Sequence, residues 1–406
     1  MSKQNENRQG YKKTKAGWIP EEWECKHLGE HLNKIVGGGT PSKQVNQYWN
    51  GCIPWATVKD VSKGNLLDTI DHITETGLEN SASNLIQADT VIVSTRMAVG
   101  ASIRFIVDVA INQDLKALYP NKNLLNDFLY WLIIHNERKL AKMGIGSTVD
   151  GIRINDINFL VIPLPPLSEQ KKISKILSAW DKAIEQVGKL IEAKQKLKEA
   201  LMQQLLTCKR RFKEFKEIKW HEFVLGDVFK ERKETNRSDL PLLSITSGRG
   251  VINSNLLDKK DSSTEDKSKY KRIVPGDIGY NTMRMWQGVS ALSDLEGIVS
   301  PAYTICTPRK QLYGSFAKHL FKFKPMIHVF WRFSQCMVSD TLNLKFHNFE
   351  QIKIKIPCVG EQKEMAGVLN TIDREIELLK NKVDKLKKQK KGLMQKLLTG
   401  EIRVKT

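Results

Sequence analysis

Two arginines stand at matching places in the chain, and their side chains suit recognition of a nucleic acid. Arg96 follows the β-like run "ADTVIVST" and Arg284 follows "GDIGYNTM". The guanidinium group offers a planar fork of donors that can bind guanine O6 and N7 together. A formal net charge of +20, spread along the 406 residues, favours a polyanionic partner. Both arginines are therefore candidates for reading base edges, and a phosphate contact or a structural ion pair is an equally good interpretation.

Sequence motifs for enzymatic chemistry are absent. There is no glycine-rich cofactor turn, no Walker A motif and no nuclease cluster, and the only Pro-Pro pair follows Leu164 instead of the Asn or Asp of an adenine methyltransferase. His27 and His31 have i, i+4 spacing, but Leu28 stands where a metalloprotease has Glu, so we expect a solvated helix face. The six cysteines are far apart, without CxxC pairs. We therefore expect no catalytic residue, no metal site and reduced thiols.

Other local features are assigned structural roles. The glycines at residues 37–39 are expected to form a turn with unusual backbone angles, and no Lys-Ser/Thr follows them at P-loop spacing. Trp55 is expected in the core. The N-terminus lacks the apolar segment of a signal peptide, and the longest apolar run, residues 128–134, is too short to span a bilayer. We expect a cytoplasmic protein without a membrane partner.

The elements that must position these residues are organised by a repeat. Residues 168–207 recur without a gap as residues 360–399, offset by 192 positions. In both copies, alternate steps of four and three residues trace an apolar stripe, which is typical of a coiled-coil seam. The stripe is interrupted by Lys194 and Lys198 in the first copy and by Lys390 in the second, and Lys198 and Lys390 stand at the same step. Each copy predicts a helix about 55 to 60 Å long that pairs with the other, parallel or antiparallel, and acts as a spacer.

A globular segment precedes each helix. Both segments contain short β-like runs, such as residues 89–95, 103–111, 159–164 and 351–357, and fewer helical stretches, such as residues 125–143. The fold class is therefore α+β: two globular α/β domains separated by two long helices that pair as a coiled coil, in a pseudo-twofold internal repeat. The expected boundaries are residues 1–167, 168–207, 208–359 and 360–406.

The repeated blocks carry a family resemblance. Each helix is entered through Pro-x-x-(Ser/Gly)-Glu-Gln-Lys and ends in Leu-Met-Gln-x-Leu-Leu-Thr, and the first globule contains "GGGTPS" followed by "YWNGCIPWATVKDV". With these motifs, the whole chain resembles the specificity (S, HsdS) subunit of type I restriction-modification systems. The second globule departs from the pattern, because it opens with "LPLLSITSGRGVI" and lacks a clear "GGTPS". Roles known for the family can therefore be assigned to individual residues more firmly in the first globule and the helices than in the second globule.

The resemblance implies a non-catalytic subunit whose two target recognition domains each read half of a bipartite, asymmetric sequence in double-stranded DNA. The helices would set the half-site spacing and dock two modification (methyltransferase) subunits, and restriction (motor and nuclease) subunits would complete the complex. S-adenosylmethionine, ATP and Mg2+ are expected in those partners and not in this chain. The alternative is a coiled-coil adaptor whose globular domains bind protein.

Candidate residues follow from the resemblance and from side-chain chemistry. Bases would be read by polar loop side chains, and phosphates would be bound by Lys and Arg. The DNA-binding candidates are Ser42, Lys43, Gln44, Thr57, Lys59, Arg96, Arg153, Ser247, Arg249, Asn281, Arg284, Trp286, Gln287 and Lys345. Arg153 and Lys345 match each other before the last β-like run of each globule and could clamp the DNA backbone, although a solvated charge is the more common role. The candidates for helix pairing and subunit contact are Ile173, Leu177, Trp180, Ile184, Met365, Leu369, Ile372 and Ile376.

Overall fold

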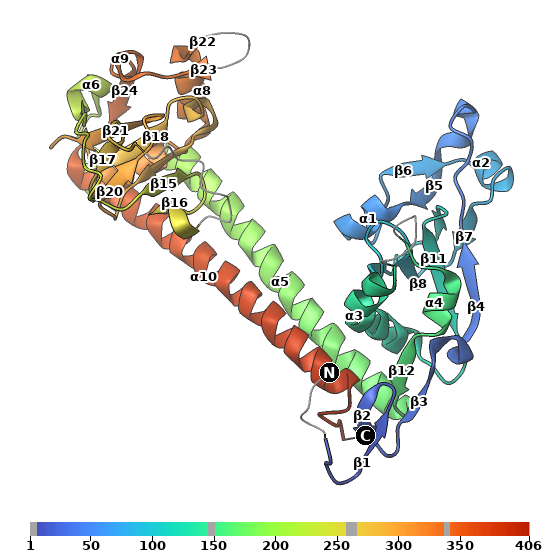
Figure 1. Ribbon diagram of the computed structural model, residues 1–406. Coiled ribbons are helices and arrows are strands. Elements are labelled where there is room, and N and C mark those ends of the chain that lie inside the picture. Colours follow the sequence, from blue (N-terminus) through green and yellow to red (C-terminus); the bar gives the residue numbers. More distant parts are fainter. Residues whose placement is uncertain (1–5, 145–150, 257–265, 337–341, 406) are drawn as a thin grey trace. The chain divides into compact units, whose positions relative to one another are not determined.

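The computed structural model describes residues 6–144, 151–256, 266–336 and 342–405. The chain forms two compact units. The first comprises Met1–Val187 with Lys382–Thr406, and the second comprises Gly188–Asn381. Two long helices, α5 (Leu167–Leu205) and α10 (Val359–Leu398), contribute one part to each unit (Figure 1). Each unit is thus a globular domain together with a segment of both helices.

The first globular domain is built from short strands and one long helix. A four-stranded sheet of order β4-β11-β8-β9 packs against α3 (Asn126–Met143), and a second sheet has the order β6-β5-β10-β7. The strands of the first domain are β1 (Tyr11–Thr14), β2 (Gly17–Pro20), β3 (Glu24–His27), β4 (Leu32–Gly37), β5 (Trp49–Ala56), β6 (Asp71–Ile73), β7 (Asn84–Ile86), β8 (Val91–Ser94), β9 (Ser102–Ile103), β10 (Val109–Ile111), β11 (Leu115–Pro120) and β12 (Val161–Leu164). The shorter helices are η2 (Leu28–His31), η3 (Asn46–Tyr48), α1 (Val58–Lys63), α2 (Glu75–Glu79) and α4 (Ile154–Asn158).

The second globular domain repeats this plan. Its four-stranded sheet has the order β14-β21-β18-β19, and β13 pairs with β24 as β3 pairs with β12. Its strands are β13 (His221–Val224), β14 (Phe229–Glu231), β15 (Leu243–Thr246), β16 (Gly250–Asn253), β17 (Lys271–Ile273), β18 (Ile278–Asn281), β19 (Ser290–Leu292), β20 (Gly297–Val299), β21 (Tyr303–Pro308), β22 (Gln335–Cys336), β23 (Leu342–Asn343) and β24 (Lys353–Ile356). The helices are η4 (Lys213–Phe215), α6 (Leu225–Val228), η5 (Ser254–Leu256), η6 (Met285–Gln287), α7 (Gly314–Leu320), α8 (Lys324–Phe333) and α9 (Phe346–Phe349).

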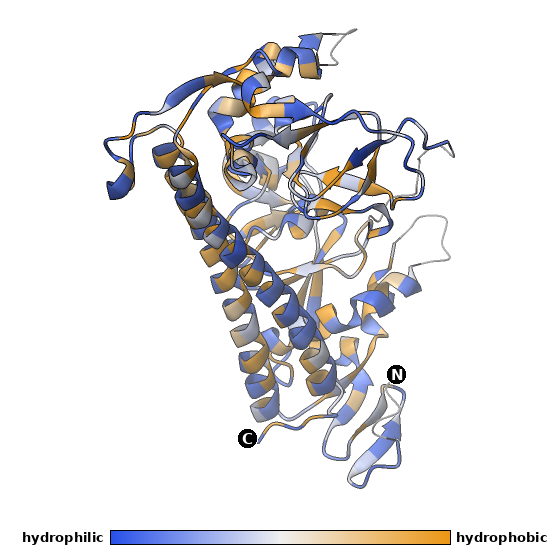
Figure 2. Cartoon of the chain, turned by 90° about the vertical axis from the view of Figure 1, so that its left-hand side faces the viewer, coloured by the Kyte–Doolittle hydropathy of each residue, from blue (hydrophilic) through white to orange (hydrophobic). Residues whose placement is uncertain are grey.

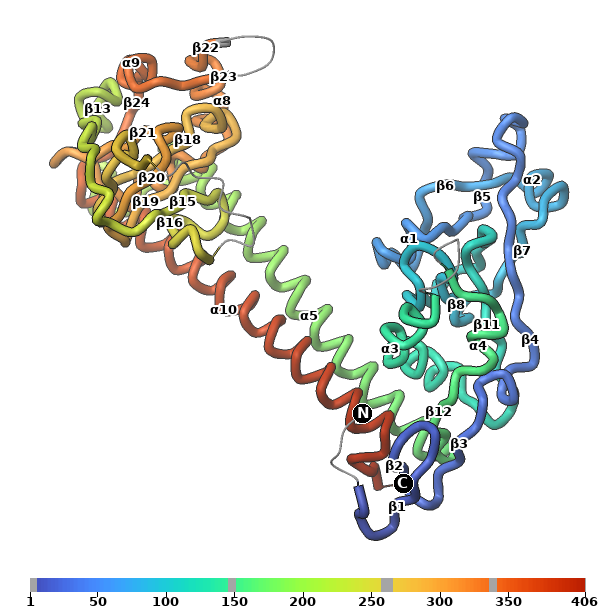
Figure 3. The backbone as a smooth tube through the Cα atoms, viewed as in Figure 1, coloured from blue at the N-terminus to red at the C-terminus, as the bar shows by residue number. Residues whose placement is uncertain are grey.

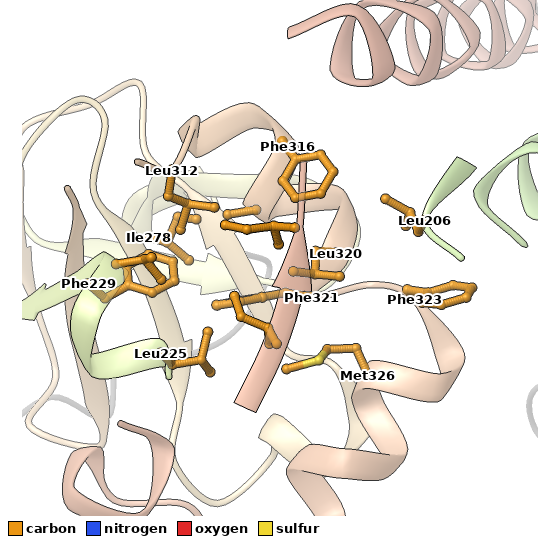
Figure 4. Close-up of a cluster of buried hydrophobic side chains, with 14 of the residues drawn as sticks. Leu206, Leu225, Phe229, Ile278, Leu312, Phe316, Leu320, Phe321, Phe323 and Met326 are labelled. Carbon is orange, nitrogen blue, oxygen red and sulfur yellow. The ribbon is translucent and has the colours of Figure 1, made fainter. Parts of the chain in front are cut away.

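The helix that packs on the sheet differs between the two domains. The single helix α3 of the first domain corresponds to α7 and α8 in the second, where Pro325 lies in the first turn of α8. Proline lacks the N–H that a continuous helix would need there and clashes with the preceding turn. The core beside this break is aromatic and aliphatic, with Phe316, Leu320 and Phe321 packed near Phe229 (Figure 4).

Helices α5 and α10 run antiparallel within each unit. In the first unit Asp181 of α5 pairs with Lys390 of α10, and in the second Lys198 of α5 pairs with Asp373 of α10. Figure 2 shows hydrophobic positions recurring along both helices among hydrophilic ones. Every seam position is buried or half-buried, including Ile173, Leu177, Trp180, Ile184, Met365, Leu369, Ile372 and Ile376. The sequence periodicity therefore predicted which face of each helix is buried. The structure adds that the two helices run antiparallel.

A charged anchor fixes the start of each long helix. Glu169 accepts hydrogen bonds from Arg403 Nε at 2.8 Å and Nη2 at 3.0 Å. An equivalent pair stands at the start of the second helix, where Glu361 accepts from Arg211 Nε at 2.9 Å and Nη2 at 2.6 Å. Glu361 lies 192 residues after Glu169, and Arg211 lies 192 residues before Arg403. Each glutamate is buried. The Glu-Gln motif of the sequence is thus a structural anchor.

The glutamine of the same motif joins each helix to its domain. Gln170 Oε1 accepts from the Leu125 backbone N–H at 2.9 Å, just before α3. Gln362 Oε1 accepts from the Tyr313 N–H at 2.8 Å, just before α7. One glutamine at the start of each long helix therefore joins that helix to its globular domain.

The chain termini meet within the first unit. Tyr11 Oη donates to the carbonyl of Gly400 at 2.7 Å, and Arg8 Nη1 donates to the carbonyl of Glu401 at 3.0 Å. Figure 3 shows the end of the chain beside β1 and β2. In the second unit the corresponding connection from α5 to β13 is continuous chain.

Three sequence expectations are corrected. His27 ends a strand and His31 lies buried at the end of η2, so they do not share a solvated helix face. The backbone angles of residues 37–39 are not left-handed; a Cβ on Gly38 would lie 1.9 Å from the Ile111 carbonyl oxygen, so close packing requires this glycine. The apolar run at residues 103–111 is divided between β9 and β10, which belong to different sheets.

Candidate nucleic-acid interface

The same backbone contact builds one loop edge in each domain. After β8, the carbonyl of Thr95 accepts a hydrogen bond from the Ile152 N–H at 2.8 Å, and after β18, the carbonyl of Thr282 accepts from the Leu344 N–H at 2.8 Å. These contacts join the backbone just before Arg96 to that just before Arg153, and the backbone two residues before Arg284 to that just before Lys345, from distant parts of the sequence. All four side chains are exposed. Two cations therefore stand at an equivalent edge of each domain.

Arg96 is oriented by a neighbouring carboxylate. Its Nη1 lies 3.6 Å from Asp114 Oδ1, and the carbonyl of Asp114 accepts from both the N–H and the hydroxyl of Thr95. Lys116 is nearby; burial lowers its pKa, Asp114 raises it and Arg96 lowers it. Arg96 is therefore an exposed but partly neutralised cation.

Arg284 is exposed on a tight turn. For its guanidinium, the described parts of the chain provide no hydrogen bond or ion pair. The turn is shaped by Asn281 Oδ1, which accepts from the Met283 N–H at 3.0 Å, and by Trp286 Nε1, which donates to the Met283 carbonyl at 3.0 Å. Gln287 is also exposed here. Asn281 and Trp286 thus stabilise the turn, while Arg284 and Gln287 present free donors.

Two tryptophans hold the glycine-rich loop of the first domain. Trp55 Nε1 donates to the Gly39 carbonyl, and Trp49 Nε1 donates to the Ser42 carbonyl, both at 3.1 Å. The two rings pack edge to face, with centroids 5.1 Å apart. Trp55 is buried, as expected. The exposed residues that this arrangement presents are Ser42, Lys43 and Gln44.

Thr57 serves as a helix cap. It is the N-cap of α1, where its hydroxyl donates to Asp60 Oδ2 at 2.9 Å and accepts from the Lys59 N–H at 3.3 Å. Both hydrogen-bonding functions of the hydroxyl are thus used within the domain. The side chain of Lys59 is exposed, so its ammonium group can reach a ligand in solvent.

Ser247 and Arg249 lie at the exposed tip of the β15–β16 hairpin. Lys322 connects this tip to the turn after β18, because its Nζ donates to the carbonyl of Ser247 at 3.3 Å and to that of Gly288 at 2.7 Å. The structure therefore brings the two groups of candidates in the second domain together.

A basic groove adjoins the loop edge of the second domain. Its volume is about 1000 Å³, and it is lined by Thr282 and Met283 together with four lysines and two glutamates, Lys230, Lys233, Lys271, Lys345, Glu231 and Glu350. A smaller groove of about 540 Å³ lies at the matching place in the first domain, beside Asn33 and Lys34. Sequence reasoning missed Lys230, Lys233 and Lys271. The run of charges in "FKERKE" was a signal for Lys230 and Lys233, and no comparable signal marked Lys271. Phosphates are the ligands that such a groove suits.

Other kinds of site find no support in the described residues. They contain no group of three or more His, Cys, Asp and Glu side chains placed to hold a metal ion, and no helix long and apolar enough to cross a membrane. The cysteines whose side chains are described, Cys25, Cys52, Cys208, Cys306 and Cys358, form no disulfide.

Comparison with known proteins decides the family. The model of the type I restriction modification DNA specificity domain matches residues 20–213 and again residues 217–388. The chain belongs to this family of type I DNA specificity subunits. The specificity subunit is non-catalytic, and it recognises DNA for a restriction and methylation complex.

Relatives match this chain over different parts of its length. It is 27% identical to the putative type I restriction enzyme MjaX specificity subunit of Methanocaldococcus jannaschii, over 98% of each chain. It is 33% identical to the EcoR124I/EcoR124II specificity subunit of Escherichia coli, over 39% of this chain and 41% of that one. The type I S subunit from M. genitalium shares its fold, with a TM-score of 0.58, 16% identity and coverage of 94% and 96% of the two chains.

Proposed function

We propose that each globular domain reads one half of a bipartite, asymmetric target in double-stranded DNA. The proposed division is a first target recognition domain at residues 1–167, a central helix at 168–207, a second target recognition domain at 208–359 and a C-terminal helix at 360–406. The observation that carries the proposal is the loop edge shared by both domains, where Arg96 stands with Arg153 and Arg284 with Lys345. One scaffold with different loop residues suits two different half-sites.

Within this edge, the contacts divide by chemistry. Base edges would be read by side chains with free donors or acceptors, and the phosphate backbone would be bound by exposed lysines and arginines. Candidates for bases are Ser42, Lys43, Gln44, Arg96, Ser247, Arg249, Arg284 and Gln287. Candidates for phosphates are Lys59, Arg153, Lys230 and Lys345. Thr57, Asn281 and Trp286 would act by shaping the loops that carry these contacts.

The paired helices would space the two readers and dock their partners. The buried seam residues hold α5 against α10, which leaves the outer faces of both helices for two modification subunits. Those subunits would bind S-adenosylmethionine and methylate adenine, and restriction subunits would use ATP and Mg2+. Because the complex would act on chromosomal DNA, we expect it in the cytoplasm.

The test is a methylation map. The chain is expressed with its modification subunit in a host without other adenine methyltransferases, and methylated adenines are mapped across the genome. A bipartite motif with a constant gap is expected. Exchange of residues 208–359 for the corresponding segment of another specificity subunit should then alter one half-site and leave the other unchanged. A motif without two halves, or an exchange that leaves both halves unchanged, would refute the proposal.

A further inference from the structure

Lys322 occupies a break that exists only in the second domain. It lies between α7 and α8, where Pro325 prevents a continuous helix. In the first domain α3 continues through the corresponding place, and the residue 188 positions earlier is Ile134. At the break, the side chain of Lys322 reaches the loops that contain Ser247 and Gly288. In the first domain the continuous helix has the apolar Ile134 at this place.

The ammonium of Lys322 is held by two carbonyl groups. It donates to the Gly288 carbonyl at 2.7 Å and to the Ser247 carbonyl at 3.3 Å, and the described residues offer it no carboxylate partner. Nearby Lys198 and Lys318 share Asp373, at 2.5 Å and 3.9 Å. Taking a charge out of water is costly unless it is hydrogen-bonded, so these two carbonyls stabilise the half-buried cation.

The two carbonyls belong to the two candidate reading loops. Ser247 is at the tip of the β15–β16 hairpin, next to Arg249. Gly288, with φ of +75°, closes the turn that carries Arg284 and Gln287. A left-handed glycine permits the sharp reversal that points this carbonyl at the ammonium. Movement of either loop would break one of the two hydrogen bonds.

We propose that Lys322 is a positioning residue for sequence discrimination: it ties the hairpin tip to the turn after β18, so that both loops meet the DNA in a fixed register. The inference rests on the proposed function and deepens it for the second half-site. Lys322 itself touches no base. Because the first domain has no equivalent lysine, the effect is confined to one half of the target.

The first experiment compares Lys322→Met with the unmodified chain in the complete methyltransferase complex. Methylation is measured on a library of duplexes in which every base of both half-sites is varied. Methionine keeps the length of the stem and removes the donors. We expect discrimination to fall about tenfold at one or more positions of the second half-site, the loss typical of a charged hydrogen bond. The first half-site should change by less than about twofold.

A matched control removes a neighbouring charge. Lys324 is exposed on α8 and faces Glu199 at 3.4 Å, without contact to either loop. Lys324→Met should leave both half-sites unchanged. The inference is overturned if Lys322→Met discriminates like the unmodified complex, or if it loses activity equally on all sequences. Absence of a bipartite motif in the unmodified complex would instead refute the proposed function.

A pH series tests the same contact in the unmodified chain. Burial, together with the positive charges of Lys198 and Lys318, lowers the pKa of Lys322 to about 8. The charged and titratable groups on the elements around it include Lys198 and Glu199 on α5, Lys318 and His319 on α7, Lys324 on α8, Asp373 on α10, and Arg249 and Arg284 on the loops. Discrimination in the second half-site should decline between about pH 7 and 9 and stay constant in the first. Lys322→Arg should remove this decline; a flat profile in the unmodified complex would contradict the inference.

Discussion

Lys198 of α5 pairs with Asp373 of α10 at 2.5 Å, and Lys390 and Asp181 repeat the pair with the two helices exchanged. Each lysine occupies a position in the apolar seam, and each aspartate directly follows one. Polar groups in a seam specify register and orientation at a cost in stability. The lysine that interrupts each repeat is therefore part of the antiparallel pairing.

Lys198→Ala should lower the free energy of unfolding by about 1 to 2 kcal/mol. The side chains of the pair are 20% and 32% exposed, so the loss should lie between that of a surface pair and that of a buried one. Urea unfolding measures it. Asp373→Ala should cost a similar amount, and the double variant should cost less than the sum of the two. Strict additivity would show that the pair does not stabilise the helices; exposed Lys196→Ala serves as the control.

Arg211→Ala should destabilise the second unit more strongly, by about 3 kcal/mol or more. Glu361 is completely buried, so removal of Arg211 leaves a charge without its bidentate partner. The side-chain hydrogen bonds to Glu361 raise the pKa of Arg211, which keeps the partner cationic. Thermal and urea unfolding check the loss, with exposed Arg210→Ala as the control. Equal stability of the two variants would exclude the anchor role.

Acidification should loosen the second unit through His319. This residue is 1% exposed, its Nε2 faces Asn370 Oδ1 at 2.8 Å, and burial lowers its pKa to about 4. Because the unfolded chain binds the proton near pH 6.5 and the folded chain only near pH 4, stability should fall across that window by about 1 kcal/mol per pH unit.

The control for this pH effect is His319→Gln, which should flatten the dependence between about pH 6.5 and 4. The first unit has Trp131 at the matching place, where the ammonium of Lys390 lies 4.4 Å from the ring centroid. A tryptophan does not titrate. A pH dependence that persists in His319→Gln would assign it to other groups.

Arg284→Ala should relax one base position of the second half-site. A bidentate contact to guanine discriminates by about 1 to 3 kcal/mol, and the described structure gives this guanidinium no competing partner. Methylation of a randomised duplex library measures the preference. A uniform loss across all sequences would identify a phosphate contact instead. Arg96→Ala makes the parallel test in the first half-site. Because Arg96 lies near Asp114, its guanidinium must leave this carboxylate before it can bind a base.

Insertion of one heptad into both long helices should lengthen the gap of the target. The insertions belong after Val187 in α5 and after Asn381 in α10, because the unit boundary lies there in both helices and the seam keeps its phase. Seven residues add about 10 Å of helix, or about 3 base pairs of DNA. The methylation motif reports the gap. An unchanged gap in an active complex would rule out the spacer role.

The helices show what periodicity can and cannot predict. The step of 3.5 residues identified the buried positions from Ile173 onward, because only one face of each helix meets its partner. A seam has no direction, so parallel and antiparallel pairing were equally compatible with it. Direction follows from Asp181 and Asp373, which lie just outside the seam and whose partners are 209 and 175 residues away in the sequence.

The loop edge shows a similar limit. The place of Arg96 and Arg284 after a β-like run was visible in the sequence, since a strand that ends in a polar loop carries a local signal. Their approach to Arg153 and Lys345 depends on backbone contacts between distant segments, which no local pattern encodes. The role of Thr57 could have been predicted from Thr-x-x-Asp, a capping-box spacing before a helix.

The meeting of the two termini has a consequence for how the chain is made on the ribosome. The core of the first unit includes Leu397 and Leu398, together with Trp23 and Phe128. Synthesis proceeds from the N-terminus, so the first unit, begun earliest, can close only after its last helical turn has left the ribosome. The second unit has all its residues by Asn381. A truncation that removes Leu397 and Leu398 would therefore damage the core of the first unit, although most of that unit is translated before the second unit.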